Sequence, residues 1–436
     1  MLSTINTGDT AWVLMSTGLV LFMVIGLAFF YGGMVRSQHV LHMVLQNLLC
    51  IGIVTVTWLV AGFSLSFAGR GQYIGDFSLA GVNHLDTVTL PGFMGVHELT
   101  VPNYAFFHYH MMFAIITPAL ITGATADRLK MKSWALLVFI WSLVVYPPVC
   151  KWIFSPVGWF ARKGALDFAG GAVVHTSAGA AALAIVLVIG PRKGWPKHLG
   201  HIRPNSMPLV LLGTGILWFG WFGFNAGSAL GANLLAVHAL VNTQVAGAAG
   251  LAFWLVAERI KGGSITSLGG ASGAIAGLAA VTPAAGYVQP FAALGIGAMA
   301  GAICCFATEL KYVFKYDDAL DVIGVHLVGG IFGTLCVGLF ADSTIKPDIL
   351  NGLFNGGGFH LLGLQAMMVG VTFAFAFGAT YIIAISIHRT IGLRATPEEE
   401  ARGLDLSELV ETAYFHSPDF AIDDDGDADG APQSAL

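Results

Sequence analysis

The sequence predicts an all-α integral membrane protein with eleven transmembrane helices. Of its 436 residues, 56% are hydrophobic and only 10% are charged, whereas a soluble domain carries about 25% charged residues. Apolar runs recur along most of the chain, and a helix needs about 20 apolar residues to cross a bilayer, because every backbone amide must bond within the segment. We therefore expect a transmembrane domain over residues 1–391, followed by a soluble tail over 392–436.

Charges and turn residues divide the apolar sequence into eleven segments. The segments are 10–33, 40–68, 102–125, 133–153, 168–190, 208–227, 231–257, 266–283, 287–309, 321–341 and 358–388. The first run lacks the basic residues that precede the core of a signal peptide and is too long for one, so we interpret it as a span. An odd number of spans places the two termini on opposite sides of the membrane.

The lysines and arginines predict the orientation, because cytoplasmic loops carry an excess of positive charge. With the N-terminus outside, the cytoplasmic segments hold 15 of the 20 basic residues: Arg36, Arg128, Lys130, Lys132, Arg192, Lys193, Lys197, Arg203, Arg259, Lys261, Lys311, Lys315, Arg389, Arg394 and Arg402. The outer side then holds five: Arg70, Lys151, Arg162, Lys163 and Lys346. This asymmetry predicts an outside N-terminus and a cytoplasmic C-terminus.

The tail differs in composition from the membrane domain. We expect a short capped helix that begins near Thr396 in TPEEEARGLDLSELVE, and a solvated, disordered end at DDDGDADG, residues 423–430. The five cysteines lie in apolar surroundings without a CxxC pair, which predicts neither a disulfide scaffold nor a zinc site.

Two histidines stand in similar settings inside predicted spans five and ten, DFAGGAVVHTSAGAAAL and DALDVIGVHLVGGIFGTL. His175 follows Asp167 by eight residues, about 12 Å of helix, and His326 follows Asp321 by five, about 7.5 Å. A lone membrane histidine is as often a satisfied structural residue as a functional one. Two at matching positions favour function, and they predict an inverted repeat of helices 1–5 and 6–10 that brings both imidazoles to the midplane.

The two aspartates have an ordinary structural explanation. A carboxylate at a helix start accepts hydrogen bonds from free backbone amides, so we interpret Asp167 and Asp321 as capping residues, with an electrostatic aid to cations as the second choice. The two neutral imidazoles can share a proton and still offer hydrogen bonds to a small polar passenger.

Aromatic residues accompany these spans in FFHYHMMFAIITPALITGATADRLK and WFGWFGFNAGSALGAN. Tyr109 and Phe113 are four residues apart, as are Phe224 and Ser228, so each pair shares a helix face. Aromatic faces attract a small cation and a hydroxyl can accept a hydrogen bond from it. Ordinary packing is the alternative for each aromatic taken alone.

Several motifs, in order, resemble the Amt/Mep branch of the Amt/Mep/Rh ammonium transporter family. They are FYGGMVR, GALDFAGGAVVH, WFGFNAGSALGAN, SGAIAGLAAVTPAAGYV and DDALDVIGVH, and the resemblance extends from about residue 10 to Tyr414. It implies a homotrimer in the cell (plasma) membrane, with one pore per subunit and uptake of ammonium. It implies neither an enzyme, a cofactor, a bound metal nor a nucleic-acid partner.

The resemblance also implies roles for individual residues. An outer recruitment site would use Tyr109, Ser228 and an aromatic residue from CKWIFSPVGW, which we align as Phe154, with Trp152 and Trp159 close by. The remaining assignments are a phenyl gate at Phe113 and Phe224, a pore lined by His175, His326 and Trp221, and an entrance shaped by Asp167.

Three departures from the family pattern stand out. Phe154 occupies a position where the family usually has tryptophan, which offers cations a stronger face. His110 replaces a frequent glutamine and adds a titratable group near the entrance. Leu409 and Val410 stand where the tail of family members often has His-Gly. This departure weakens the expectation that the tail is coupled to the pore and that it binds a PII-type signalling protein.

The resulting hypothesis is that ammonium is recruited at the outer aromatic site, loses its proton and crosses as ammonia past the twin histidines. Desolvating a cation in hydrocarbon costs far more than desolvating ammonia. The sequence leaves open whether the proton follows. It has no ATP-binding P-loop, so a gradient must drive transport. The alternatives are an ammonium sensor that hardly conducts and signals through its tail, and an intramembrane metalloenzyme, which lacks a third ligand cluster.

Overall fold

The computed structural model describes residues 5–95, 98–196 and 204–414, and within these ranges the chain is helical, without β-strands. An isolated bridge pairs Leu129 with Arg394. The acidic stretch 423–430 lies outside the described residues. The predicted all-α fold is confirmed.

Ten helical segments of the described chain are long and apolar enough to cross a membrane. They are Thr7–Met34, Ser37–Phe67, Asn103–Thr125, Met131–Phe154, Gly171–Ile189, Met207–Ala229, Leu234–Ile260, Pro290–Phe314, Ile323–Phe340 and His360–Thr390. Each lies within a few residues of a predicted span. The predicted span 266–283 corresponds to a shorter apolar helix, Ser267–Val281.

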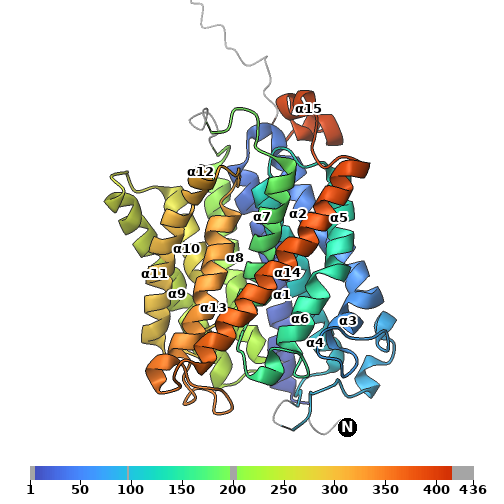
Figure 1. Cartoon of the computed structure of the whole chain (residues 1–436), viewed down its shortest axis with the longest axis vertical. Helices are drawn as coiled ribbons and strands as arrows, with labels where there is room; N and C mark the ends of the chain where they lie inside the picture. Colours follow the sequence, from blue (N-terminus) through green and yellow to red (C-terminus); the bar gives the residue numbers. More distant parts are fainter. Residues whose placement is uncertain (1–4, 96–97, 197–203, 415–436) are drawn as a thin grey trace, which may run out of the picture.

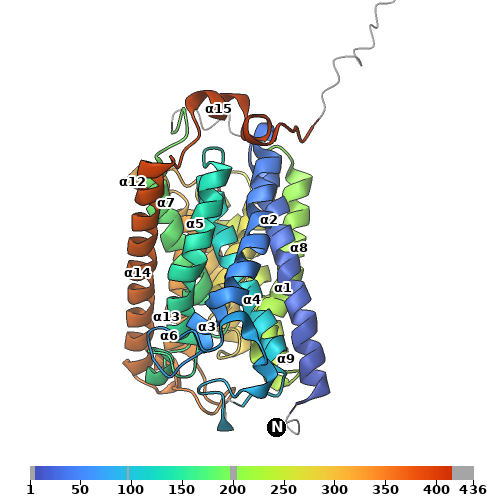
Figure 2. The ribbon, with the colours of Figure 1, turned by 90° about the vertical axis from the view of Figure 1, so that its right-hand side faces the viewer.

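Figure 1 shows these segments as a bundle of roughly parallel and antiparallel helices, with the long α14 crossing one face obliquely. The α-helices are α1 Thr7–Met34, α2 Val40–Thr57, α3 Phe63–Phe67, α4 Asn103–Ile121, α5 Met131–Val144, α6 Tyr146–Phe154, α7 Ser177–Ile189, α8 Met207–Ala226, α9 Leu234–Ile260, α10 Ser267–Val281, α11 Pro290–Ala307, α12 Leu310–Phe314, α13 Val328–Phe340, α14 His360–Thr390 and α15 Pro397–Arg402. Figures 1 and 2 both place α15 at the end of the bundle opposite the N-terminus.

Glycines allow α1 and α8, the first and sixth predicted spans, to pack closely along much of their length. A Cβ on Gly213 would lie 2.4 Å from the backbone nitrogen of Phe30, and one on Gly220 would lie 2.2 Å from a side-chain carbon of Met23. Such contacts are too short for any side chain, so small residues set the helix separation. The glycines that permit the close packing of α1 on α8 are therefore visible in the sequence itself.

The outer surface of the bundle carries exposed large apolar side chains. Examples are Leu14, Met15, Phe22, Val60, Phe139, Leu187, Leu212, Phe219, Val256, Phe291, Met299 and Ile382. An apolar surface of this extent is unfavourable in water and suits contact with lipid chains. The helices therefore bury small and polar residues inside and present hydrocarbon outside.

The tail folds back onto the α15 end of the bundle. The Thr396 hydroxyl accepts the Glu399 amide while the Glu399 carboxylate accepts the Thr396 amide, so the capping box predicted near Thr396 is present. The Asp405 carboxylate then accepts the His42 amide at 2.8 Å, and the Glu408 carboxylate accepts the Met131 amide at 2.7 Å. These bonds tie the tail to the first turns of α2 and α5.

A buried charge network lies at the same end of the bundle. Arg192 donates from Nε and Nη2 to the two carboxylate oxygens of Asp317, each at 2.8 Å, and its Nη1 lies 3.6 Å from Asp127. Arg36 donates to Asp127 at 3.2 Å. Burial by itself raises the pKa of Asp317, but the hydrogen bonds from Arg192 and the charge of Arg128 outweigh it and hold that pKa below its usual value.

Candidate functional site

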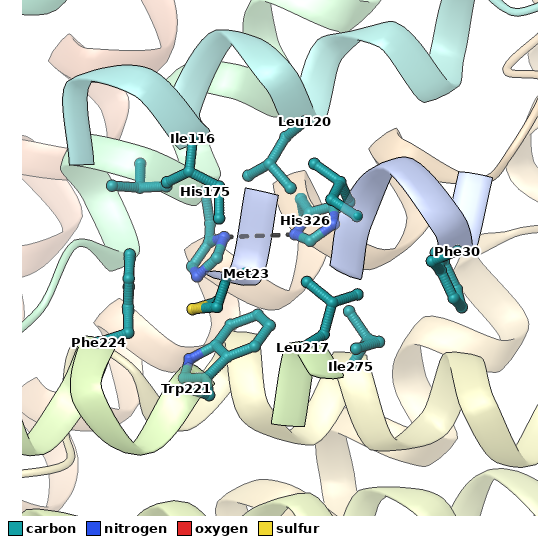
Figure 3. Close-up of a pocket in the computed structure, with 12 residues that line it drawn as sticks. Met23, Phe30, Ile116, Leu120, His175, Leu217, Trp221, Phe224, Ile275 and His326 are labelled. Carbon is teal, nitrogen blue, oxygen red and sulfur yellow. Dashed lines mark hydrogen bonds between the residues drawn. The ribbon is translucent and has the colours of Figure 1, made fainter. Parts of the chain in front are cut away.

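Two π-helical turns position the two histidines at the centre of the bundle. His175 lies in η8, Gly171–Thr176, and His326 lies in η11, Ile323–Leu327; each turn leads into a helix of 13 residues, α7 and α13. The imidazoles are only 2% and 4% exposed. Their rings stack at 17° with centroids 5.3 Å apart, and the two Nδ1 atoms are 3.3 Å apart (Figure 3).

Matching glycines allow the two histidine segments to cross. Gly179 follows His175 by four residues, and Gly330 follows His326 by four. A Cβ on Gly179 would lie 2.7 Å from the backbone nitrogen of Leu327, and one on Gly330 would lie 2.8 Å from Cβ of His175. Each glycine thus packs against the histidine turn of the other segment, and the contact brings the imidazoles within hydrogen-bond reach.

A capping aspartate begins each histidine segment. In the second segment it is a different residue from the one that we predicted. Asp167 accepts four backbone amides, those of residues 170–173, at 2.7–3.1 Å. In the second segment Asp318 accepts the amides of Val322 and Ile323 at 3.1 and 2.6 Å. The predicted capping role is therefore correct for Asp167 and wrong for Asp321.

The reason lies in the backbone at Asp321. Its φ of +62° is left-handed, so its side chain turns away from the helix start. Its carboxylate instead accepts a hydrogen bond from Lys311 Nζ at 2.6 Å. Asp318 lies eight residues before His326, the same spacing as Asp167 before His175, so the two halves match more closely than we expected. Burial, together with the charge of Asp321, raises the pKa of Asp318 above its usual value.

The histidine contact defines what the pair can offer a passenger. Only one hydrogen lies between the two Nδ1 atoms, so one ring donates and the other accepts. In the neutral pair the donor ring then has a free lone pair on Nε2, whereas the acceptor ring carries its hydrogen on Nε2. Whichever ring donates, the pair presents one acceptor and one donor to the path beside it.

A narrow inner cavity runs along the histidine pair. It is lined by Met23, Leu27, Phe30, Ile116, Leu120, Val174, His175, Leu217, Trp221, Phe224, Ile275 and His326. Its volume is about 10 Å³ for the centre of a water-sized molecule, so it has room for a single small molecule at a time. Trp221 stacks on His175 at 22°, and its indole donates to the Thr282 hydroxyl at 2.9 Å.

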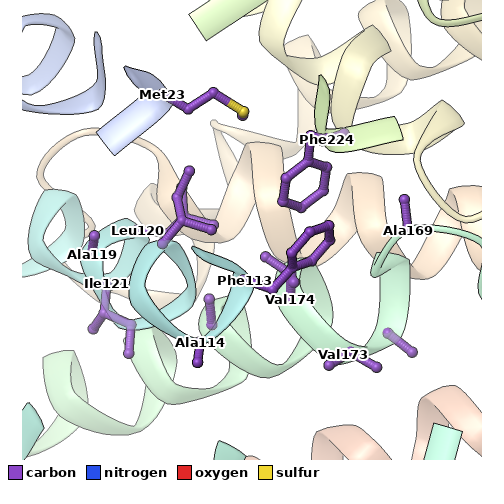
Figure 4. Packing of buried hydrophobic residues seen from close by; sticks show 14 of the residues in the cluster. Met23, Phe113, Ala114, Ala119, Leu120, Ile121, Ala169, Val173, Val174 and Phe224 are labelled. Carbon is purple, nitrogen blue, oxygen red and sulfur yellow. The ribbon is translucent and has the colours of Figure 1, made fainter. Parts of the chain in front are cut away.

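Two stacked phenyl rings separate this cavity from a larger one. Phe113 of α4 and Phe224 of α8 stack at 17° with centroids 4.3 Å apart (Figure 4). Phe224 lines the inner cavity, whereas Phe113 lines an outer cavity of about 890 Å³. The predicted gate residues therefore stand as a closed partition between the two spaces.

The outer cavity brings the predicted recruitment residues together. Tyr109 is buried and donates to the carbonyl oxygens of Gly223 and Phe224, both at 2.9 Å, and its hydroxyl lies 3.2 Å from that of Ser228. Ser228, Phe154 and Asp167 line the same cavity. The two carboxylate oxygens of Asp167 are engaged by its four amides, so Asp167 shapes the wall of this space.

Of these three aromatic residues, Phe154 lines the outer cavity, whereas Trp152 and Trp159 are not part of its lining. The centroid of Phe154 lies 6.2 Å from that of Phe113. The indole of Trp152 donates to the Tyr73 carbonyl at 2.7 Å and packs against Phe375, and Trp159 stacks on Phe160. The structure therefore favours Phe154 over either tryptophan for this position.

Comparison with known proteins identifies the family. The model of the Ammonium Transporter Family matches residues 11–414. The chain belongs to this family. The ammonium transporter of Mycobacterium tuberculosis (strain H37Rv) is 45% identical over 439 residues, which cover 95% of this chain and 91% of that protein. This member of the ammonium transporter family is a multi-pass membrane protein and not an enzyme.

Solved structures agree with that assignment. A structure titled "Sensor Amt Protein" matches this chain with a TM-score of 0.84 and 32% identity, over 92% of this chain and 98% of that one. The crystal structure of Candida albicans Mep2 matches with a TM-score of 0.84 and 32% identity, over 91% of this chain and 88% of that one. The fold is thus that of Amt and Mep proteins.

The sequence interpretation overlooked four residues that hold the two histidine segments and Trp221 in place. They are Asp318, Gly179, Gly330 and Thr282. For the first three a signal was present, because an aspartate eight residues before and a glycine four residues after each histidine repeat in both halves. For Thr282 there was none, since its partner Trp221 is 61 residues away in the chain.

Proposed function

We propose that the protein takes up ammonium across the cell membrane and conducts it as ammonia through its inner cavity. The observation that carries this proposal is the His175–His326 pair, buried in a cavity that is otherwise almost wholly apolar. Such a path offers one acceptor and one donor to a small neutral molecule, while it gives a cation no compensation for lost water.

The route begins in the outer cavity. Ammonium is held there by the hydroxyls of Tyr109 and Ser228 and by the ring of Phe154, because aromatic faces and hydroxyl oxygens both attract a cation. The cation transfers its proton to solvent water in the outer cavity, before the partition of Phe113 and Phe224. Ammonia then passes the displaced rings, exchanges hydrogen bonds with His175 and His326 beside Trp221, and leaves at the far end. Whether the released proton also crosses the membrane decides only the net charge that is moved with each ammonia molecule.

The membrane arrangement forms part of the same proposal. The short helix α10 also crosses the membrane and brings the number of spans to eleven, so that the described N-terminal end lies outside and α15 lies in the cytoplasm. Support comes from the pairing of α1 with α8 and of the α7 and α13 segments, as expected for an inverted repeat of helices 1–5 and 6–10. The membrane domain then ends at residue 391, and a tail from 392 follows. A homotrimer, and a PII-type partner at the cytoplasmic face, complete the proposal.

Uptake by purified protein in proteoliposomes tests the function directly. We expect ammonium to evoke a current or a luminal pH change, and labelled methylammonium to accumulate down its gradient. The double variant His175→Ala/His326→Ala is expected to lose selectivity for ammonium over potassium. Absence of uptake by the wild-type protein would refute transport, and unchanged selectivity in the double variant would refute the role of the histidines.

A second candidate is an ammonium sensor with little conduction. It is favoured by the similarity to the structure titled "Sensor Amt Protein" and by the bonds that hold residues 405–408 against α2 and α5. Ammonium-dependent exposure of the tail to protease without measurable flux would support the sensor over the transporter. The metalloenzyme alternative finds no support, since no group of three or more potential metal ligands occurs within residues 5–95, 98–196 and 204–414.

A further inference from the structure

His110 is a buried polar group in the outer cavity for which the proposed pathway has no use. It lies on α4, one residue after Tyr109, and is 8% exposed. Its Nδ1 atom is buried without a hydrogen-bond partner among the described residues. The hydroxyl of Tyr109, in the same helical turn, has three oxygen neighbours within hydrogen-bond distance. An imidazole buried without a partner is unfavourable unless a ligand completes it.

The surroundings of the imidazole are aromatic on several sides. The ring centroid of His110 lies 4.3 Å from that of Phe106, 4.9 Å from Phe67, 5.6 Å from Phe154 and 5.9 Å from Phe113. These phenyl rings come from α3, α4 and α6, and none of them can donate a hydrogen bond to a ring nitrogen. The other ring nitrogen, Nε2, is not among the enclosed atoms, so a small molecule in the outer cavity that His110 lines is the partner available to it.

The chemistry of that partner follows from the two kinds of group at the site. A neutral imidazole has one nitrogen lone pair, which accepts a hydrogen bond from an N–H donor. Phenyl rings attract a cation through their quadrupole. A donor that is also a small cation fits both. Because His110 lines the outer cavity together with Tyr109, Ser228 and Phe154, it can reach the same ligand as these residues.

We propose that the imidazole of His110 is an additional binding group for ammonium, accepting a hydrogen bond from the cation on the outer side of Phe113. This inference rests on the proposed function and extends it, since it assigns a titratable ligand to the recruitment site. Protonation of the ring removes its free lone pair and adds a positive charge. The proposed hydrogen bond from ammonium therefore requires the neutral imidazole.

Other titratable groups face the same space and must be separated from this effect. Tyr109 is adjacent on α4, and the phenyl rings of α3 and α6 against His110 do not titrate. The remaining titratable residues that line the cavity are Asp9, Glu98, Arg162, Lys163, Asp167, Tyr287, Lys346, Asp348 and His360. His360 is a second imidazole, so the His360→Gln variant is one control. His108, exposed on the same helix, provides the other as His108→Gln.

Two substitutions distinguish binding from packing because the two roles predict opposite orders. His110→Phe fills the aromatic surroundings but removes the acceptor, whereas His110→Gln keeps an uncharged acceptor oxygen and fits the surroundings less well. Binding predicts a KM for methylammonium near the wild-type value in His110→Gln and about tenfold higher in His110→Phe, with Vmax little changed. A packing role predicts normal transport in His110→Phe and the larger defect in His110→Gln.

Two histidine controls and ligand binding complete the test. We expect the KM for methylammonium to stay at the wild-type value in His108→Gln and His360→Gln. A wild-type KM in His110→Phe would overturn the proposal. Thermal unfolding of each purified variant with and without ammonium chloride reports binding independently of flux.

These readouts also separate this inference from the proposed function. Ammonium that stabilises the wild type but not His110→Phe, without uptake by either, would refute conduction and retain the binding role. Uptake by the wild type with equal KM in all variants would retain conduction and refute the role of His110. Neither uptake nor stabilisation in the wild type would refute both.

Discussion

The capping aspartates provide a graded test of how the histidine segments are held. Asp167 uses each carboxylate oxygen for two backbone amides, with bonds of 2.7–3.1 Å. Asp167→Asn keeps one carbonyl oxygen and places an amide group against the other two donors. Two buried N–H groups are left without an acceptor, and each costs about 1–3 kcal/mol, so we expect a loss of about 2–6 kcal/mol in stability.

The other half provides matched controls of smaller magnitude. Asp318 uses each oxygen for a single amide, so Asp318→Asn loses one acceptor, at a cost of about 1–3 kcal/mol. Asp321 caps no helix, is 30% exposed on its side chain and pairs with Lys311. A partly exposed ion pair contributes about 0–1 kcal/mol after screening by solvent. The expected order of destabilisation is Asp167→Asn, then Asp318→Asn, then Asp321→Asn.

Thermal unfolding of the purified proteins in detergent measures this order, and uptake in proteoliposomes reports its effect on the pathway. We expect the loss of uptake to follow the loss of stability, because the capped turn holds His175 in place. Equal midpoints for Asp167→Asn and Asp321→Asn would refute the capping argument. A fully stable Asp167→Asn variant with reduced ammonium uptake would instead indicate that the carboxylate acts on the cation directly.

Three further predictions concern the crossing, the partition and the charge network. Gly330→Ala places a methyl group against Cβ of His175; we expect a loss of about 1–3 kcal/mol from overpacking, seen in thermal unfolding, together with reduced uptake. Phe113→Ala opens the partition, so larger alkylamines should gain about tenfold in uptake relative to ammonium in a competition assay, and unchanged ratios would contradict its role. Arg192→Met removes the two guanidinium hydrogen bonds to Asp317 and leaves only Arg128, 3.9 Å away, so it should cost about 3 kcal/mol, the lower end for a broken buried ion pair. Because the folded pKa of Asp317 lies below its unfolded value, its contribution is complete above the unfolded pKa and is lost as pH falls through the folded one. The thermal unfolding midpoints of the wild type and of this variant should therefore approach each other as the pH is lowered through the acidic range.

The positions of the spans could be predicted because they depend on local composition. A run of about 20 apolar residues must form a helix in lipid whatever surrounds it. The predicted ends therefore differ from those of the structure by a few residues. Helix α10, Ser267–Val281, lies within two residues of the predicted span 266–283 at both ends, but its 15 residues are fewer than the about 20 that a membrane crossing usually takes.

The site could be predicted only in part, and Asp321 illustrates why. Both Asp318 and Asp321 precede a helix start, and sequence spacing alone allows either to cap it. The left-handed backbone at Asp321 and its bond to Lys311 decide between them, and both depend on how α12 packs beside η11. The sequence also left open whether Phe154 or one of two nearby tryptophans lines the outer cavity, because the direction of each side chain depends on its tertiary contacts.

The sequence by itself determined the all-helical membrane fold, the family and the two histidine segments, because apolar length and ordered motifs are local properties. Only the tertiary structure decided that the Nδ1 atoms of His175 and His326, 151 residues apart, lie within 3.3 Å. It also decided that His110 is surrounded by phenyl rings from three helices. Distances between segments depend on the contacts of α7 with η11 and of α13 with η8, and on the aromatic contacts of α3 and α6 with α4, which no single stretch of sequence contains.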